Sequence, residues 1–136
     1  MIKTLIVYLL TAGVFFSLDI LWLGLVAKNF YQKHLQGFLS EKVNWTAAII
    51  FYLLFIIGIF IFSILPAVEK NSLGKVLILG ALFGFFTYAT YDLTNLATLK
   101  HWPMIVVLVD ILWGIFLTAC TSVAGYVIWT WIKSSN

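Results

Sequence analysis

Three aspartates stand inside long apolar stretches of this 136-residue chain, where water does not reach their side chains. They are Asp19, Asp92 and Asp110, whereas the other two acidic residues, Glu41 and Glu69, fall between the apolar stretches. A charged carboxylate at membrane depth costs roughly 3 kcal/mol or more, so such residues are by default candidates for a functional site. Carboxylates of this kind could form an acid–base pair or bind a divalent cation.

The three aspartates are expected at a similar depth. Asp19 lies about eight residues before the end of the first apolar stretch, Asp92 about six before the end of the third, and Asp110 about seven after the start of the fourth. At about 1.5 Å per helical residue, each lies roughly 9–12 Å below the same membrane surface. We therefore predict that three helices bring these carboxyl groups into one shared pocket, as candidate catalytic residues and as the ligands of any divalent cation used as a cofactor.

The sequence Asp-Ile-Leu-Trp occurs twice, at residues 19–22 and 110–113. Because Asp and Trp three residues apart share a helix face, Trp22 and Trp113 are candidate ligand-binding residues beside the carboxyl groups. The two stretches run in opposite directions, so the copies would be related by a local two-fold axis in the membrane plane. Repeats of that kind often surround membrane binding sites.

The third apolar stretch carries the most polar run of the chain, residues 88–95, in which positions 88, 92 and 95 share one helix face. Gly80 and Gly84 continue this face, and small residues let a neighbouring helix approach closely. The polar side chains would then face the bundle interior, which makes Tyr88, Tyr91 and Asn95 candidate ligand-binding residues. The alternative is that they only hydrogen-bond across helices and hold the bundle together.

His101 follows the third stretch, in a short connection beside Trp102. It could reach toward Asp92 or Asp110 as a ligand-binding residue or proton relay. The alternative is a histidine at the membrane surface in contact with water.

Four apolar stretches position these residues, at about residues 4–27, 45–65, 75–98 and 103–132. Of all residues 63% are hydrophobic and only 10% are charged, compared with about 25% charged in a soluble domain. A helix that crosses the membrane needs about 20 apolar residues, and it satisfies its own backbone hydrogen bonds in lipid. We predict an all-α integral membrane four-helix bundle, a single transmembrane domain over residues 1–136 with both ends on one side.

The segment 28–44 is longer than the connections at 66–74 and 99–102. Its apolar residues fall on one side of a helix, opposite Lys33 and Gln36, which predicts a short amphipathic helix in the membrane interface between spans one and two. An irregular loop is the alternative. The apolar residues are Phe30, Tyr31, Leu35, Phe38 and Leu39.

The basic residues are eight lysines, scattered singly near the ends of the apolar stretches. There they can extend their ammonium groups to the membrane surface, whereas a nucleic-acid-binding protein gathers them on one face. We therefore expect the lipid bilayer, and not nucleic acid, as the partner. Four lysines flank each side of the predicted bundle, so the positive-inside rule gives no orientation.

The run from Tyr88 to Lys100, with Trp102-Pro103 after it, closely resembles one known family, and so do residues 19–24, 51–54 and 110–114. That family is a group of small predicted bacterial membrane proteins of unknown function, domain-of-unknown-function family 2177. The resemblance covers nearly the whole chain. It implies a bacterial membrane protein of four spans, and it implies no established chemistry. We expect a multi-pass protein of the cell inner membrane.

Three classes of function remain open at this point. The first is an enzyme or binding protein for a lipid, an acyl chain or a cation, with apolar walls for the chain and carboxyl groups at its polar end. The second is a small proton- or ion-coupled transporter, for which four helices are few, so a homodimer would be expected. The third is a non-catalytic accessory module that binds a small molecule or a partner helix without turnover.

Overall fold

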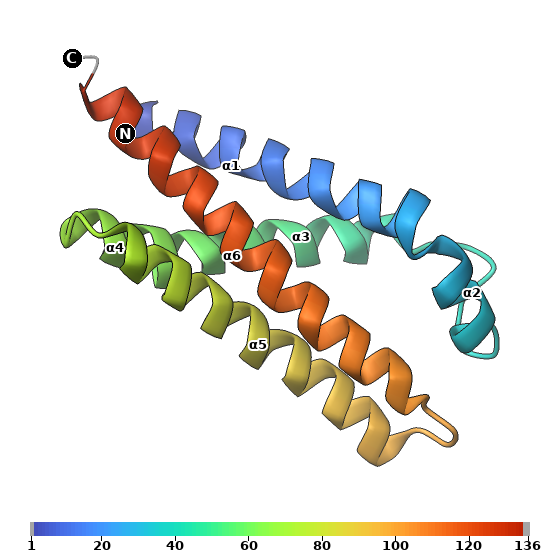
Figure 1. The fold of residues 1–136 in the computed structure, drawn as a ribbon. Coiled ribbons are helices and arrows are strands. Elements are labelled where there is room, and N and C mark those ends of the chain that lie inside the picture. Colours follow the sequence, from blue (N-terminus) through green and yellow to red (C-terminus); the bar gives the residue numbers. More distant parts are fainter. Residues whose placement is uncertain (1, 135–136) are drawn as a thin grey trace.

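The structure is a computed structural model that describes residues 2–134 (Figure 1). Its α-helices are α1 (Ile2–Leu21), α2 (Lys28–Leu35), α3 (Trp45–Ile59), α4 (Leu65–Glu69), α5 (Leu73–Thr98) and α6 (Met104–Ser134), with π-helical segments at Trp22–Val26 and Phe60–Ile64. Because the π-helical segments continue α1 and join α3 to α4, four helical rods result, at Ile2–Val26, Trp45–Glu69, Leu73–Thr98 and Met104–Ser134. Each is long and apolar enough to cross a membrane, which confirms the predicted all-α membrane bundle.

The closest pair in the bundle is α5 and α6, which run side by side in opposite directions (Figure 1). Their backbones meet at glycines. A Cβ atom added to Gly84 would overlap the carbonyl oxygen of Gly114, and one added to Gly80 would lie 2.6 Å from the Ser122 hydroxyl oxygen. Small residues therefore allow the near contact of these two helices.

The core of the bundle lies where α1, the α3–α4 rod and α6 meet. Phe15 of α1 packs edge-on against Tyr52, with ring centroids 5.9 Å apart. The largest side chains that are almost completely buried are Phe15, Ile56, Ile59, Ile64 and Leu117. Most other large apolar side chains are exposed on the outside of the bundle, as expected when lipid is the surrounding solvent.

The α3–α4 rod lies against α5 mainly at its π-helical segment Phe60–Ile64, where the Ser63 hydroxyl donates to the Val76 carbonyl at 3.2 Å. Toward the start of α3 the two helices diverge, as Figure 1 shows. Aromatic side chains still bridge the gap: Phe55 of α3 packs against Phe83 and Tyr88 of α5, with ring centroids 5.5 and 6.2 Å apart. The divergence is the feature of the fold that creates the pocket described below.

The predicted amphipathic helix forms as α2, over Lys28–Leu35, and is shorter than the segment 28–44 from which it was predicted. The amides of Phe38 and Leu39 both donate to the Leu35 carbonyl, which ends it. Its apolar face, with Phe30 and Tyr31, packs against the buried Trp102 near the start of α6. Helix α2 thus covers one end of the bundle.

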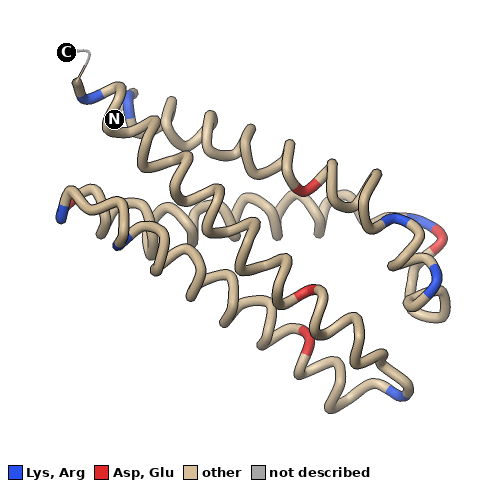
Figure 2. The backbone as a smooth tube through the Cα atoms, viewed as in Figure 1, with Lys and Arg blue, Asp and Glu red and all other residues tan. Residues whose placement is uncertain are grey.

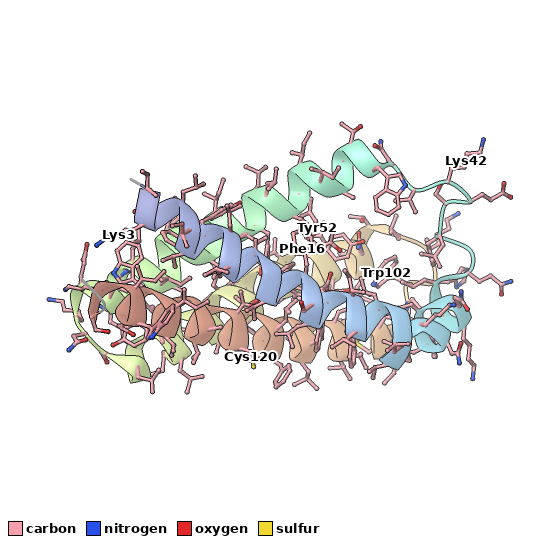
Figure 3. All side chains as sticks on the ribbon, turned by 90° about the horizontal axis from the view of Figure 1, so that it is seen from above. Lys3, Phe16, Lys42, Tyr52, Trp102 and Cys120 are labelled. Carbon is pink, nitrogen blue, oxygen red and sulfur yellow. The ribbon has the colours of Figure 1, made fainter. Side chains whose placement is uncertain are left out.

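The positively charged side chains lie where a membrane bundle needs them, near its two ends. The lysines gather toward the two ends, whereas acidic residues also occur within the bundle (Figure 2). Lys3 and Lys42 lie at opposite ends in Figure 3, with Tyr52 and Phe16 between the helices. Both chain ends lie at the Lys3 end (Figure 1).

Candidate functional site

Asp19 is almost fully buried near the end of α1, and its side chain is 6% exposed. Its two carboxyl oxygens accept from two other helices. The Tyr52 hydroxyl of α3 donates to Oδ2 at 2.8 Å, and the Trp113 indole N–H of α6 donates to Oδ1 at 3.4 Å. Asp19 therefore links three helices, and both of its oxygens already have protein partners.

Asp110 is half-buried on α6, and its hydrogen-bond partner comes from α2. The Tyr31 hydroxyl of α2 donates a short hydrogen bond to its Oδ1. The Trp22 indole N–H in turn donates to the Tyr31 hydroxyl oxygen at 3.1 Å. Burial, together with the hydrogen bond to Asp110, raises the pKa of Tyr31 above its usual value, so the phenol stays protonated and remains a donor at neutral pH.

The two Asp-Ile-Leu-Trp segments meet at their tryptophans. The indole rings of Trp22 and Trp113 stack with centroids 4.4 Å apart and planes 7° from parallel. Each tryptophan then serves the aspartate of the other segment: Trp113 bonds Asp19 directly, and Trp22 reaches Asp110 through Tyr31. The two segments therefore exchange their tryptophans, and the stacked indole rings lie between the two aspartates' hydrogen bonds.

Asp92 has different surroundings. Its side chain is fully buried on α5, and neither oxygen accepts a hydrogen bond from any residue in the range 2–134. The indole N–H of Trp102 is also buried without a partner among these residues. The Trp102 indole N–H lies near the Asp92 carboxyl group, and Asp110 acts on that carboxyl group electrostatically, so these three groups occupy one neighbourhood at the α2 end of the bundle.

The three carboxyl groups have different hydrogen-bond partners, and of the three only Asp110 belongs to the lining of the pocket described below, so a pocket shared by all three stays a prediction. Asp19 and Asp110 are bound by separate sets of tyrosine and tryptophan, and Asp92 has no protein partner. Within the described part of the chain, no group of three or more His, Cys, Asp or Glu side chains could hold a metal ion. Counting residues along each helix gave the depth of each carboxyl group. The facing tyrosines determine which hydrogen bonds Asp19 and Asp110 accept.

A pocket of about 850 Å³ lies between the diverging helices α3 and α5. Aromatic side chains form most of its wall, and a carboxyl group from α6 lies at its inner side. Its lining residues are Phe51 and Phe55 of α3, Phe83, Phe86, Thr87, Tyr88, Thr90 and Tyr91 of α5, and Asp110 of α6.

A comparison with protein families decides the identity of the chain. The profile of a family described as "Predicted membrane protein (DUF2177)" matches residues 4–127. The chain belongs to this family. Comparisons with curated proteins and with solved structures found no match. The resemblance noted in the sequence is thereby confirmed, and the DUF2177 protein is a multi-pass membrane protein with four helices able to span.

Of the other residues predicted to bind a ligand, some line the pocket and others lie outside it. Tyr88 lines it, and its ring packs so close to α6 that a Cβ atom on Gly114 would overlap it. Tyr91 lies at the outer edge with 60% of its surface exposed, and Asn95 is half-buried outside the pocket lining. His101 is exposed in the α5–α6 turn with a φ of 61°, and it has no hydrogen bond to either aspartate.

Sequence reasoning missed two residues of the DUF2177 site, Tyr31 and Tyr52. In the sequence, Tyr31 falls on the apolar face of the predicted amphipathic helix, and Tyr52 lies in a predicted span, residues 45–65, that has no charged residue. Each donates its hydroxyl to a different aspartate. The available signal was that a buried tyrosine hydroxyl needs a partner, but the sequence did not show which aspartate each would meet.

Proposed function

We propose that this protein binds the hydrocarbon chain of a lipid in the pocket between α3 and α5, in the inner membrane. The observation that carries the proposal is an apolar pocket between two membrane-crossing helices that has a carboxyl group at its inner side. Pockets that bind small molecules typically measure about 300–1,000 Å³ and combine mostly apolar walls with a few polar groups. This pocket has that size and composition.

The position of the pocket along the bundle supports the same conclusion. Phe51 and Phe86, which form part of its rim, are 52% and 61% exposed, and both lie well inside their spans. Their exposed surfaces therefore face the lipid chains. A chain could enter from the side while the polar end of its molecule approaches Asp110.

The test uses a long-chain alkane that carries a photoreactive diazirine at its middle, with the protein in phosphatidylcholine nanodiscs. An alkane has no head group, so it reports chain binding alone. We expect labelling of Phe83 and Thr87 to exceed that of Leu82 and Leu93 by several-fold. Those two leucines lie on the same helix, are 46% and 52% exposed, and are not in the pocket lining.

A matched pair of variants separates pocket binding from contact with bulk lipid. Thr87→Trp fills the pocket and should remove the excess labelling of Phe83. Thr94→Trp places the same side chain on an exposed part of α5 outside the lining and should leave the excess unchanged. Equal labelling of pocket and outward residues in the unmodified protein would refute the proposed function.

A further inference from the structure

The polar part of the pocket contains one carboxyl oxygen and two tyrosine hydroxyls, of Tyr88 and Tyr91, that have no hydrogen bond to the described residues. Oδ1 of Asp110 accepts from Tyr31, but Oδ2 accepts from no residue that the structure describes. The Tyr88 hydroxyl also has no hydrogen bond to the described residues, and its side chain lines the pocket beside Asp110. The Tyr88 ring lies against Gly114, one helical turn from Asp110 on α6, so both groups belong to the same part of the pocket wall.

The other polar groups near the pocket are already engaged. The hydroxyls of Thr87 and Thr90 donate to carbonyls of their own helix, at 2.7 Å to Phe83 and 2.6 Å to Phe86. Asp19 is occupied at both oxygens, as described above. Asp110, Tyr88 and Tyr91 therefore offer hydrogen bonds to a ligand in this pocket without breaking an existing one. Tyr91 lies at the outer edge with 60% of its surface exposed, so Asp110 and Tyr88 are the pair on which the inference rests.

From these two groups we infer that the ligand is a lipid whose polar end is an uncharged hydroxyl group, that is, a long-chain alcohol. This inference rests on the proposed function and specifies its substrate class. A hydroxyl group donates to Oδ2 of Asp110 and accepts from the Tyr88 hydroxyl, so it uses both groups at once.

Charged head groups fit the pocket less well. A phosphate or carboxylate would face the Asp110 carboxylate, and the pocket lining contains no lysine, so the like charges would repel without compensation. An ammonium group could donate to Asp110 and to the Tyr88 hydroxyl oxygen, but it has no lone pair, so the Tyr88 O–H would be left without an acceptor. The donor and acceptor together therefore favour the alcohol.

The experiment measures how well chain-matched compounds displace the diazirine alkane from the pocket in phosphatidylcholine nanodiscs. The compounds are hexadecanol, its methyl ether, hexadecylamine, hexadecyl phosphate and hexadecanoate. A hydrogen bond to a charged group is strong enough that hexadecanol should displace the probe at a mole fraction about tenfold below that of the ether. Hexadecyl phosphate and hexadecanoate should be weaker than the ether.

Three variants assign the preference to named groups. Asp110→Asn should reduce the alcohol-to-ether ratio to about threefold or less, because it removes the charge that strengthens the bond. Tyr88→Phe keeps the aromatic ring against Gly114 and removes only the donor, and it should reduce the ratio by a similar factor. Glu41→Gln is the matched control. It removes a carboxyl charge from the exposed segment between α2 and α3, outside the pocket lining, so the ratio should stay near tenfold.

Two results would overturn the inference while leaving chain binding intact: displacement by alcohol and ether at equal mole fractions, or displacement by hexadecylamine at a tenfold lower mole fraction than hexadecanol. An unchanged ratio in both Asp110→Asn and Tyr88→Phe would also overturn it. The absence of any pocket-specific labelling by the alkane itself would instead refute the proposed function.

Discussion

Replacement of Gly84 by alanine tests the helix contact that places Tyr88 beside Asp110. The added Cβ would overlap the carbonyl oxygen of Gly114 and lie 2.9 Å from Cβ of Thr118. Because the first of these is a backbone atom of the facing helix, it cannot rotate away as a flexible side chain would. Helices α5 and α6 must separate locally instead.

The size of the effect follows from two opposing contributions. Overpacking of a close contact costs about 1–3 kcal/mol, and a backbone clash lies toward the upper end of that range. Alanine is favoured over glycine in a helix by up to about 1 kcal/mol. We therefore expect Gly84→Ala to lower the free energy of unfolding by about 2 kcal/mol.

Gly13→Ala provides the matched control, since a Cβ atom at Gly13 of α1 would have no neighbour within 4 Å. It should leave the free energy of unfolding unchanged or raise it by up to about 1 kcal/mol. The measurement is reversible unfolding in mixed micelles, followed by circular dichroism. If both variants were equally stable, the near contact of α5 and α6 would be refuted.

Three further predictions concern the buried polar groups. Asp92→Leu should raise the free energy of unfolding in the same assay by about 1–2 kcal/mol, because it removes a buried carboxyl that has no partner; a loss of stability would show that Asp92 has a partner in the membrane. A double-mutant cycle of Asp19→Leu and Trp113→Phe, each of which removes one partner of the hydrogen bond, should give a coupling energy of about 0.6 kcal/mol and at most about 1.7, as for other hydrogen bonds between membrane helices. A value of zero would mean that the 3.4 Å contact contributes nothing. The raised pKa of Tyr31 means that its stabilising contribution is complete below the unfolded value of about 10 and is lost as the pH rises from there through the folded value. Tyr31→Phe should therefore unfold at a lower denaturant concentration at neutral pH and lose less stability above about pH 10, and an unchanged alkaline profile would contradict this assignment.

The fold could be predicted from the sequence because lipid restricts the choice so strongly. Long apolar stretches in a chain with few charges leave helices as the way to satisfy the backbone, and the structure has four such rods. The stripe containing Gly80 and Gly84 likewise indicated a close helix neighbour, since only small residues permit one. What it could not indicate was that the neighbour would be α6, with Gly114 at the contact.

The site was less accessible to sequence reasoning because it depends on how the helices rotate and diverge. The π-helical segment Trp22–Val26 follows Asp19 on α1, and its wider turn alters the direction in which side chains point relative to a regular α-helix. Counting residues at α-helical spacing cannot detect that change. The repeated Asp-Ile-Leu-Trp segment indicated a pair of related sites, but the exchange of tryptophans between them appears only once the helices pack.

The divergence of α3 from α5 also determines how any ligand would reach the pocket. An entrance whose rim faces lipid chains is approached by diffusion within the plane of the bilayer, so encounters depend on the abundance of the ligand among lipids and not on its concentration in water. Compounds with negligible aqueous solubility are then fully available to the protein. Conversely, changing the bilayer area per protein should alter occupancy even when the total amount of ligand is kept constant.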